Sequence, residues 1–214
     1  MWTNFFSRIV LINLRSRPDR LIESSLELKR HKIPFEVVNG IKNENGQQGI
    51  SDTLRGLFRN SLDAGHRNLL VFEDDVQMVV EPEEFERVMD LALIELPYNY
   101  DMLYLGANLP NPRRVSEYSA HLLRTIRALA LHAVAYSRRG MEEILSLEPR
   151  LPIDLQIAEE INTAGGSFVT YPLLCTQKES FSDIEKRPTN YACFIEDRYK
   201  EVEKYLGLSK SSLP

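Results

Sequence analysis

In the sequence LLVFEDDV (residues 69–76), a run of apolar residues is followed directly by a run of acidic residues. Four apolar or aromatic residues, 69–72, precede three consecutive carboxylates, Glu73, Asp74 and Asp75. A short apolar run of this kind is typical of a buried strand. We therefore expect a strand that carries three acids at its end.

Apolar runs of similar length recur on both sides of this stretch, and segments long enough for a helix separate several of them. Strands are expected at IVLINL (9–14), FEVVNGI (35–41), DMLYLGA (101–107), ALALHAVAYS (128–137) and GSFVTYP (166–172). Strands that alternate with helices are typical of βαβ units and a parallel sheet. The sequence predicts one α/β domain over residues 1–214, in which helices flank a Rossmann-like mixed, mostly parallel sheet.

The helices are predicted from apolar periodicity and from capping residues. They are expected at 21–30, from Ser51 or Asp52 to about Ala64, from 82 to just before Pro97, and at 138–147, 153–164 and 195–206. Gly65 is expected to end the second helix, because glycine is favoured after a helix C-terminus. Residues 176–190 are predicted to be loop, and 108–118 either a flexible active-site loop or a surface connection.

Composition limits the class of protein. The chain has 214 residues and a formal net charge of −5, and its Lys and Arg residues are dispersed, so a nucleic acid is disfavoured as a partner. Cys175 and Cys193 have no neighbour at metal-ligand spacing, which argues against a disulfide framework or a zinc site. No stretch approaches the ~20 apolar residues of a membrane span. We expect no transmembrane segment and a location in the reducing cytoplasm.

The three acids have two interpretations. Open α/β sheets bind ligands at the carboxyl ends of their strands, where Glu73, Asp74 and Asp75 are expected. Neighbouring carboxylates repel each other and lose hydration unless a cation or hydrogen-bond donors compensate, and Mg²⁺ or Mn²⁺ takes carboxylate, phosphate and water oxygens. One interpretation is a metal-diphosphate site. The other is a solvated turn in which the Asp side chains accept local backbone hydrogen bonds.

Seven segments in order resemble glycosyltransferase family 25, which contains lipooligosaccharide galactosyltransferases and collagen galactosyltransferase domains. They are VLINLRSRPDRL (10–21), FEVVNGI, LLVFEDDV, DMLYLGA, HAVAYSRRGMEEIL (132–145), PID (152–154) and FSDI (181–184), and they span roughly residues 8–185. LLVFEDDV is similar to the Asp-x-Asp motif of GT-A enzymes. The resemblance implies a GT-A-like fold in which residues 1–107 bind a nucleotide sugar and residues 108–214 bind the acceptor.

The resemblance also implies roles for residues of the first half. Asn13, Leu14 and Arg15 would contact the base and ribose of a UDP-sugar, and Arg17 or Arg20 the diphosphate. An arginine in a surface turn has the alternative of being solvated or paired with a nearby acid.

Further roles follow at the ends of the second and third strands. Asn39 would bind base or ribose, or else only form the turn before Gly40. Glu73 and Asp74 would bind ribose hydroxyls, the sugar or metal-bound water. Asp75, together with Glu73, would be a ligand of Mn²⁺ or Mg²⁺.

In the second half, Asp154 is the expected catalytic base, and its alternative role is that of an N-cap or first-turn acid that stabilises the helix. His132 is expected either to approach the metal or acceptor or simply to pack in the core. Gln177, Ser182 and Asp183 would belong to a loop that closes on the diphosphate.

One segment departs from the family pattern. The family commonly shows Gly-Cys-x-x-Ser-His at a helix start, and the aligned residues here run from Gly49 to Leu54. The glycine is kept and Thr53 supplies a hydroxyl, but Leu54 replaces the histidine, so the sugar or acceptor is expected to differ.

These observations together predict a metal-dependent inverting glycosyltransferase that moves a hexose from a UDP-sugar to a hydroxyl of a glycan or related acceptor, as in lipopolysaccharide biosynthesis. A catalytically inactive saccharide- or protein-binding relative is one alternative. A phage-type glycosyltransferase that acts on modified DNA bases is another, and it would need a local basic face from Arg113, Arg114, Arg124 and Arg127.

Overall fold

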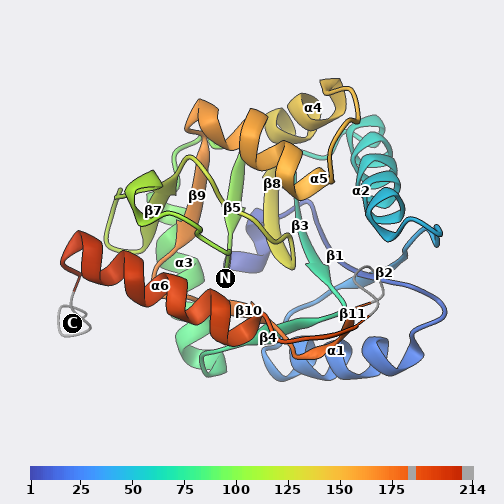
Figure 1. Cartoon of the computed structure of the whole chain (residues 1–214), viewed down its shortest axis with the longest axis horizontal. Coiled ribbons are helices and arrows are strands. Elements are labelled where there is room, and N and C mark those ends of the chain that lie inside the picture. The colour runs from blue at the N-terminus through green and yellow to red at the C-terminus, as the bar shows by residue number, and fades with distance from the viewer. Residues whose placement is uncertain (183–186, 209–214) are drawn as a thin grey trace.

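The computed structural model describes residues 1–182 and 187–208, and of residues 180–182 and 187–189 it describes the backbone alone. An eight-stranded sheet with the order β2-β1-β3-β8-β5-β9-β7-β6 forms its centre. Only β8 and β7 run against the other six strands, since β3 and β5 both pair antiparallel with β8 and β7 pairs antiparallel with β9 and β6. Figure 1 shows the strands of this sheet side by side across the middle of the molecule, with helices around them. The predicted α/β class, with a mixed and mostly parallel sheet flanked by helices, is confirmed.

The first half follows the predicted alternation. Its elements are β1 (Arg8–Asn13), α1 (Pro18–Arg30), β2 (Glu36–Asn39), α2 (Gly46–Asp63) and β3 (Asn68–Glu73), after a short 3-10 turn, η1 (Trp2–Phe5). β1 pairs parallel with both β2 and β3. As predicted, Gly65 follows the end of α2 with a positive φ of 78°.

The predicted start of α2 is wrong. Asn45, rather than Ser51 or Asp52, caps the helix, because its side-chain oxygen accepts hydrogen bonds from the backbone N–H groups of Gln47 and Gln48. An asparagine at this position satisfies two of the amides that a helix N-terminus leaves unpaired. Residues 46–50, which precede the predicted start, are therefore helix as well.

After β3, the chain contains more strands than predicted. It holds β4 (Val76–Met78), β5 (Met102–Tyr104), β6 (Val115–Glu117), β7 (Leu122–Thr125), β8 (Ala133–Ser137), β9 (Ser167–Thr170), β10 (Cys175–Gln177), β11 (Ser180–Ser182) and β12 (Arg187–Thr189). The segment 108–118 is not a single loop, because it contains the 3-10 turn η2 (Pro112–Arg114) and β6, which pairs with β7. The segment 176–190, expected to be loop, also contributes to three short strands.

The strand predicted at 128–137 begins only at Ala133. The chain turns at Ala130, which has a positive φ of 69°, and this turn interrupts the extended run. The strand predicted at 101–107 is likewise limited to Met102–Tyr104.

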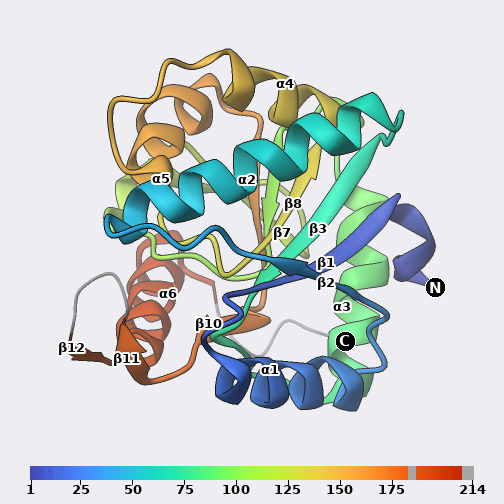
Figure 2. The same ribbon diagram turned by 90° about the vertical axis from the view of Figure 1, so that its right-hand side faces the viewer.

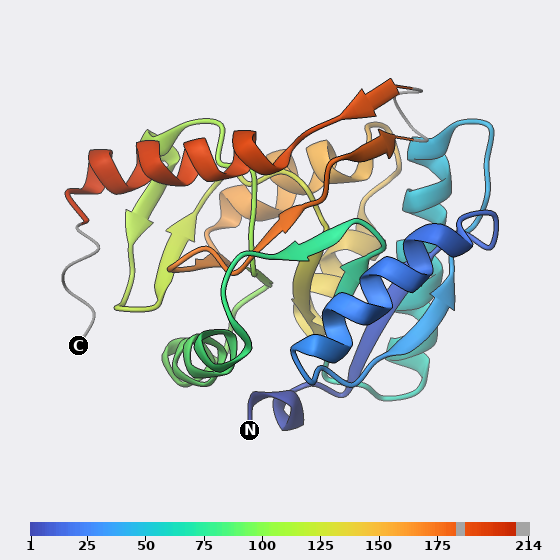
Figure 3. The same cartoon turned by 90° about the horizontal axis from the view of Figure 1, so that it is seen from below.

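Helices cover both faces of the sheet. Figure 2 shows α2, α4 (Arg138–Ser146) and α5 (Ile153–Gln156) on one face, and α1 and α3 (Pro82–Glu95) on the other. Past α5 the chain continues through a π turn, η3 (Ile157–Ile161), and a 3-10 turn, η4 (Asn162–Ala164). The last helix, α6 (Ala192–Leu206), contacts η2 and β6 and runs along that end of the molecule (Figure 3).

Side chains along the buried strands point alternately to the two faces of the sheet, and this divides the core into two clusters. Val10 and Ile12 of β1 belong to the cluster beneath α2, whereas Ile9 and Leu11 belong to the cluster beneath α3. Successive side chains of a strand point to opposite faces, so a strand covered on both faces is apolar throughout. Only the ends of these strands are free to carry polar groups.

No helix in the described part of the chain is long and apolar enough to cross a membrane.

Candidate functional site

A cavity of about 730 Å³ lies at the edge of the sheet where β1, β2 and β3 end. Its walls come from the β1–α1 turn, the β2–α2 loop, the acidic turn after β3, the start of α5, and single residues near β8, β10 and α6. The lining side chains and backbone belong to Ile12, Asn13, Leu14, Ser16, Arg17, Arg20, Gly40, Ile41, Lys42, Asn43, Gly46, Gln47, Gly49, Ile50, Thr53, Glu73, Asp74, Asp75, Asn108, Ala130, Leu131, Ile153, Asp154, Gln177 and Tyr191.

Asn13, the last residue of β1, is almost completely buried in the cavity wall, with 3% of its surface exposed. Its Nδ2 donates a hydrogen bond to the carbonyl oxygen of Leu14 at 2.8 Å. Its Oδ1 is buried and accepts no hydrogen bond from any described residue. A buried carbonyl oxygen without a donor is costly, so this atom is available to a ligand that brings an N–H or O–H group.

Asp74 ties the acidic turn to the first half of the chain. Arg20 Nη1 lies 2.9 Å from Asp74 Oδ1, and both side chains are largely buried, with 13% and 11% exposed. The backbone N–H of Leu14 also donates to the Asp74 carboxylate. Asp74 thus holds Arg20 and the end of β1 against the turn.

Asp75 is held from the opposite side by β10. Gln177 Nε2 lies 3.4 Å from Asp75 Oδ2, and the backbone N–H of Lys178 donates to the Asp75 carbonyl oxygen at 2.6 Å. β10 and β4 pair antiparallel, which fixes this geometry. Asp75 Oδ1 is buried and has no hydrogen-bond partner among the described residues.

Four carboxyl groups of the cavity have raised pKa values. Burial is the main cause for Glu73, and the nearby charges of Asp75, Asp74 and Asp154 raise its pKa further. Burial raises the pKa of Asp75 to about 6, against the opposing charge of Arg20. The pKa of Asp74 is also raised, so its burial outweighs the ion pair with Arg20.

Asp154 is the fourth carboxyl group and comes from a helix rather than from the turn after β3. It lies in the first turn of α5, and its Oδ1 accepts a hydrogen bond from the backbone N–H of Leu155 at 2.8 Å. Burial raises its pKa although this donor opposes the shift. Asp154 therefore contacts the helix start, as the structural alternative requires, and it also faces the cavity that contains the acidic turn.

The donor set suits one kind of metal ion. No group of three or more His, Cys, Asp or Glu side chains within residues 1–182 and 187–208 is arranged to hold a metal. Mg²⁺ and Mn²⁺ need only one or two carboxylates when phosphate oxygens and water complete the shell. Glu73 and the unpaired Oδ1 of Asp75 meet that requirement. The residues fit a phosphate-bound divalent ion rather than a cage made of protein ligands alone.

The cavity brings together most of the predicted site residues. Asn13, Leu14, Arg20, Glu73, Asp74, Asp75 and Asp154 all line it, together with Arg17 and Gln177. Arg15 and Asn39 are exposed and lie outside the lining, where Gly40 takes the place expected for Asn39. The side chain of Ser182 and all of Asp183 lie outside the described residues.

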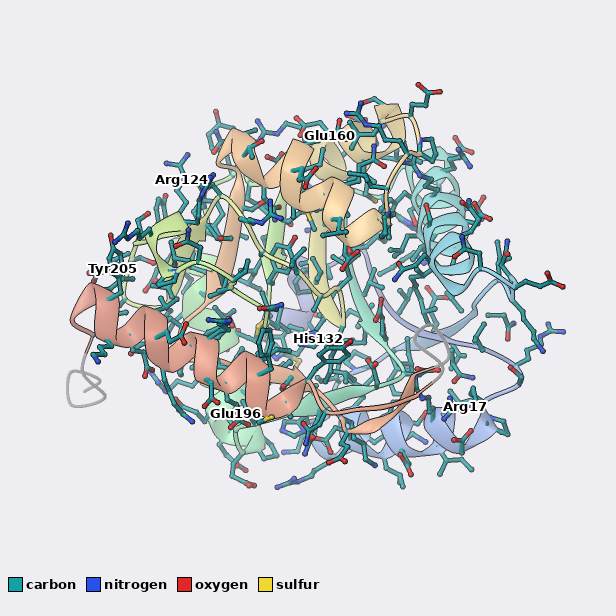
Figure 4. All side chains as sticks on the ribbon, viewed as in Figure 1. Arg17, Arg124, His132, Glu160, Glu196 and Tyr205 are labelled. Carbon is teal, nitrogen blue, oxygen red and sulfur yellow. The ribbon has the colours of Figure 1, made fainter. Side chains whose placement is uncertain are left out.

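His132 is packed in the core. It is completely buried and outside the cavity lining, although its backbone carbonyl accepts a hydrogen bond from the Glu73 N–H at 2.9 Å. Burial lowers the pKa of the imidazole to about 4, so the ring is uncharged at neutral pH. Figure 4 shows His132 in the middle of the molecule and Arg17 at the edge formed by α1.

Residues 49–54, which depart from the family pattern, make contacts that hold the fold together. Thr53 Oγ1 accepts a hydrogen bond from the Ile41 N–H at 2.8 Å and donates to the Gly49 carbonyl at 2.7 Å. A Cβ on Gly49 would lie 2.6 Å from the Ile41 carbonyl oxygen, so only glycine permits this approach. Leu54 is buried in the core cluster. These contacts fix the β2–α2 loop as a wall of the cavity.

Several lining residues were missed by the sequence analysis, among them Ile41, Lys42, Ile50 and Tyr191. The polar, glycine-bearing residues 43–49 were the only local signal for the cavity wall that holds Ile41, Lys42 and Ile50, and their pattern does not say which side chains face inward.

The arginines of the proposed basic face are partly committed to local contacts. Arg124 Nε donates to the Gly165 carbonyl at 2.7 Å, and Arg127 lies 3.9 Å from Glu159. Arg113 and Arg114 are exposed in η2.

No family model matches this sequence, and no curated protein is significantly similar to it. Solved structures with a related arrangement include a mannose-1-phosphate geranyltransferase from Thermus thermophilus, with 10% identity, a TM-score of 0.46, and 78% of this chain and 74% of that chain covered. A197 from STIV has 12% identity and a TM-score of 0.45, with 85% and 92% covered. An apo UDP-glucose pyrophosphorylase has 10% identity and a TM-score of 0.47, with 92% and 80% covered. Similarities this distant assign no function.

Proposed function

We propose that this chain is a metal-dependent inverting glycosyltransferase that transfers a hexose from a UDP-sugar to a hydroxyl of a glycan or related acceptor. One observation carries the proposal: four carboxyl groups of raised pKa, from the β3 turn and from α5, face one cavity together with Arg20. Titratable groups perturbed by burial and by each other cluster at catalytic sites. The resemblance to family 25 suggests the donor class.

Glu73 and Asp75 would hold Mn²⁺ or Mg²⁺ together with the phosphates of the donor. When bound, the ion supplies positive charge that stabilises the departing nucleoside diphosphate without a proton donor. The unpaired Asp75 Oδ1 and the raised pKa values of both acids support this role.

Other residues of the cavity would bind and orient the donor. Arg20, held by Asp74, is placed to contact a phosphate, and Lys42 lies on the β2–α2 loop at the same cavity. The buried Asn13 Oδ1 would accept a hydrogen bond from the base or ribose. Apolar side chains such as Ile12 and Ile41 give the base a surface to pack against.

Asp154 would act as the general base. The acceptor oxygen attacks the anomeric carbon while the bond from that carbon to the diphosphate oxygen breaks, and the electron pair of that bond leaves with the diphosphate. The acceptor proton moves to the Asp154 carboxylate. A raised pKa makes this carboxylate a stronger base, provided that the pH is high enough to ionise it.

Thermal unfolding in the presence of Mn²⁺ and UDP-glucose, UDP-galactose or UDP-N-acetylglucosamine tests the proposal. A donor that binds only the folded state raises the melting temperature, and at 100 times its dissociation constant it adds about 2.7 kcal/mol to the free energy of unfolding. Release of UDP from the same sugars, measured without an acceptor, should depend on Mn²⁺. If no donor raises the melting temperature and none releases UDP, the proposal is refuted.

A further inference from the structure

A second, smaller cavity adjoins the main one. It has a volume of about 330 Å³ and lies between the first turns of α2 and the segment that leads into α5. It is lined by Asn45, Gln47, Gln48, Ser51, Pro149, Arg150, Leu151 and Pro152. Gln47 lines both cavities, so this side chain lies between the two spaces. We refer to the smaller cavity as the α2–α5 groove, and Figure 2 shows the two elements side by side.

The wall of the α2–α5 groove includes a residue two positions before the proposed base. Pro152, on its wall, immediately precedes α5, and Asp154 in the first turn of that helix faces the main cavity. A molecule whose hydroxyl reaches the Asp154 carboxylate can therefore extend into the groove, away from the acidic turn that would hold the diphosphate.

The lining of the groove is suited to an uncharged polar ligand. Amide and hydroxyl side chains occupy the α2 wall, and two prolines and Leu151 occupy the other. Arg150 is the ionisable side chain of the lining, and its Nη2 lies 2.9 Å from Glu160 Oε2, so its charge is already balanced. Sugars present hydroxyls to amides and apolar ring faces to such flat side chains, while a phosphate or carboxylate would find no unbalanced cation among the described lining residues.

Both walls are held in place by contacts of their own. Asn45 caps α2, and Gln48 Nε2 donates to Asp52 Oδ1 at 2.7 Å. On the other wall, Gln156 Nε2 donates to the Glu148 carbonyl at 2.8 Å, next to the Arg150–Glu160 pair. A groove that is fixed before binding costs less conformational entropy when a ligand enters.

We infer that the α2–α5 groove binds an uncharged saccharide portion of the acceptor and directs its reactive hydroxyl to Asp154. This inference rests on the proposed function and adds the class and the path of the acceptor.

The test uses saturation-transfer NMR with lactose and maltotriose as uncharged probes and galactose 6-phosphate as a charged one. Gln48→Trp fills the groove from an exposed helix position that does not line the main cavity. Asn60→Trp is the matched control, because Asn60 is exposed on the same helix and outside both cavities. At least one uncharged probe should bind the wild type and Asn60→Trp, and bind Gln48→Trp at least tenfold more weakly.

Equal binding by Gln48→Trp, binding of galactose 6-phosphate alone, or binding of neither uncharged probe to the wild type would overturn the inference. The melting shift with Mn²⁺ and UDP reports separately on the nucleotide site and on folding. If the wild type shows this shift but binds no uncharged probe, the groove inference fails alone. If the wild type shows no shift, the proposed function itself fails.

Discussion

Buried carboxylates lie at both ends of the strands of the sheet. Their negative charge is balanced differently at the two sites. Asp101 precedes β5 and is completely buried, and Arg139 Nε lies 2.6 Å from its Oδ1. The backbone packs closely around it, because a Cβ on Gly166 would lie 1.9 Å from Asp101 Oδ2. At the opposite edge, Glu73, Asp74, Asp75 and Asp154 face a cavity in which Arg20 pairs with Asp74.

The difference separates a structural acid from a binding site. Removing a carboxylate from water is costly unless a cation lies directly against it, and Asp101 has that cation within the fold. Among the described residues that line the cavity, the acids outnumber the cationic side chains, and their charge can be balanced by a metal ion and by the protons that raised pKa values retain. The first site should therefore control stability, and the second should control ligand binding.

Among the changes that test this difference, replacement of Asp75 should have the largest effect on activity. Asp75→Asn keeps the size of the side chain but removes the charge, so Mn²⁺-dependent release of UDP should fall by about 10²- to 10³-fold, the usual cost of losing electrostatic stabilisation of a developing charge. UDP release is measured at saturating donor with and without Mn²⁺. Asp63→Asn, at the far end of α2 and exposed, is the control and should match the wild type. Unchanged activity of Asp75→Asn would remove the acidic turn from the mechanism.

Asp154→Asn should lower transfer to an acceptor by about 10²-fold or more, because a positioned general base contributes that much. The melting shift with Mn²⁺ and UDP should remain, since Asp154 is assigned to the acceptor rather than to the nucleotide. Glu159→Gln, an exposed acid five residues along the chain, is the control. Full transfer by Asp154→Asn would leave only its role at the start of α5.

At the opposite edge, Arg139→Ala should lower the free energy of unfolding by about 1–3 kcal/mol, because it leaves the buried Asp101 without its cation. Arg138→Ala is a matched control, since Arg138 has the same 48% exposure but pairs with the exposed Glu142. It should cost no more than about 0.5 kcal/mol. Urea unfolding measures both, and equal losses would show that Asp101 does not depend on the ion pair.

The smallest expected effect is the change of the free energy of unfolding with pH in the absence of metal. A carboxyl group whose pKa is raised on folding binds its proton more tightly in the folded state, so the free energy of unfolding falls as pH rises from the ordinary value of 3.8 to about 6 for Asp75. The loss should be about 1–2 kcal/mol, since one pKa unit corresponds to about 1.4 kcal/mol and part of the shift is shared with neighbouring groups. Unfolding between pH 4 and 7 should show a shallower decline in Asp75→Asn. An equally steep decline in that variant would assign the effect to other groups.

The sequence predicted those parts of the fold that local patterns determine. The apolar runs of β1 and β3 and the Pro82 start of α3 were identified because burial and helix capping act over a few residues. The acidic cluster was predicted from its position after β3, and Asp154 from a resemblance in motif order. The cavity brings these acids together, but their catalytic and metal-binding roles stay predictions.

Pairings between distant segments could not be predicted. β4 and β10 are three residues each and join residues about 100 positions apart, so no local pattern reveals them. The contact between Asp74 and Arg20 is also long-range, and it gives Asp74 a partner within the protein where the resemblance implied a ligand of the sugar. The β6–β7 hairpin is local, but it was missed because its strands are short and lack a strong apolar run.

The closure of the acidic turn by β10 has a consequence for synthesis of the chain. Residues 175–178, which hold Asp75 from one side, leave the ribosome after all four cavity acids have been made. Contacts so distant in sequence form late, because the long intervening loop must first be ordered. We expect a nascent chain that stops before residue 175 to contain all four cavity acids and yet to be unable to retain a nucleotide, so that binding competence arises only after β10 has been synthesised.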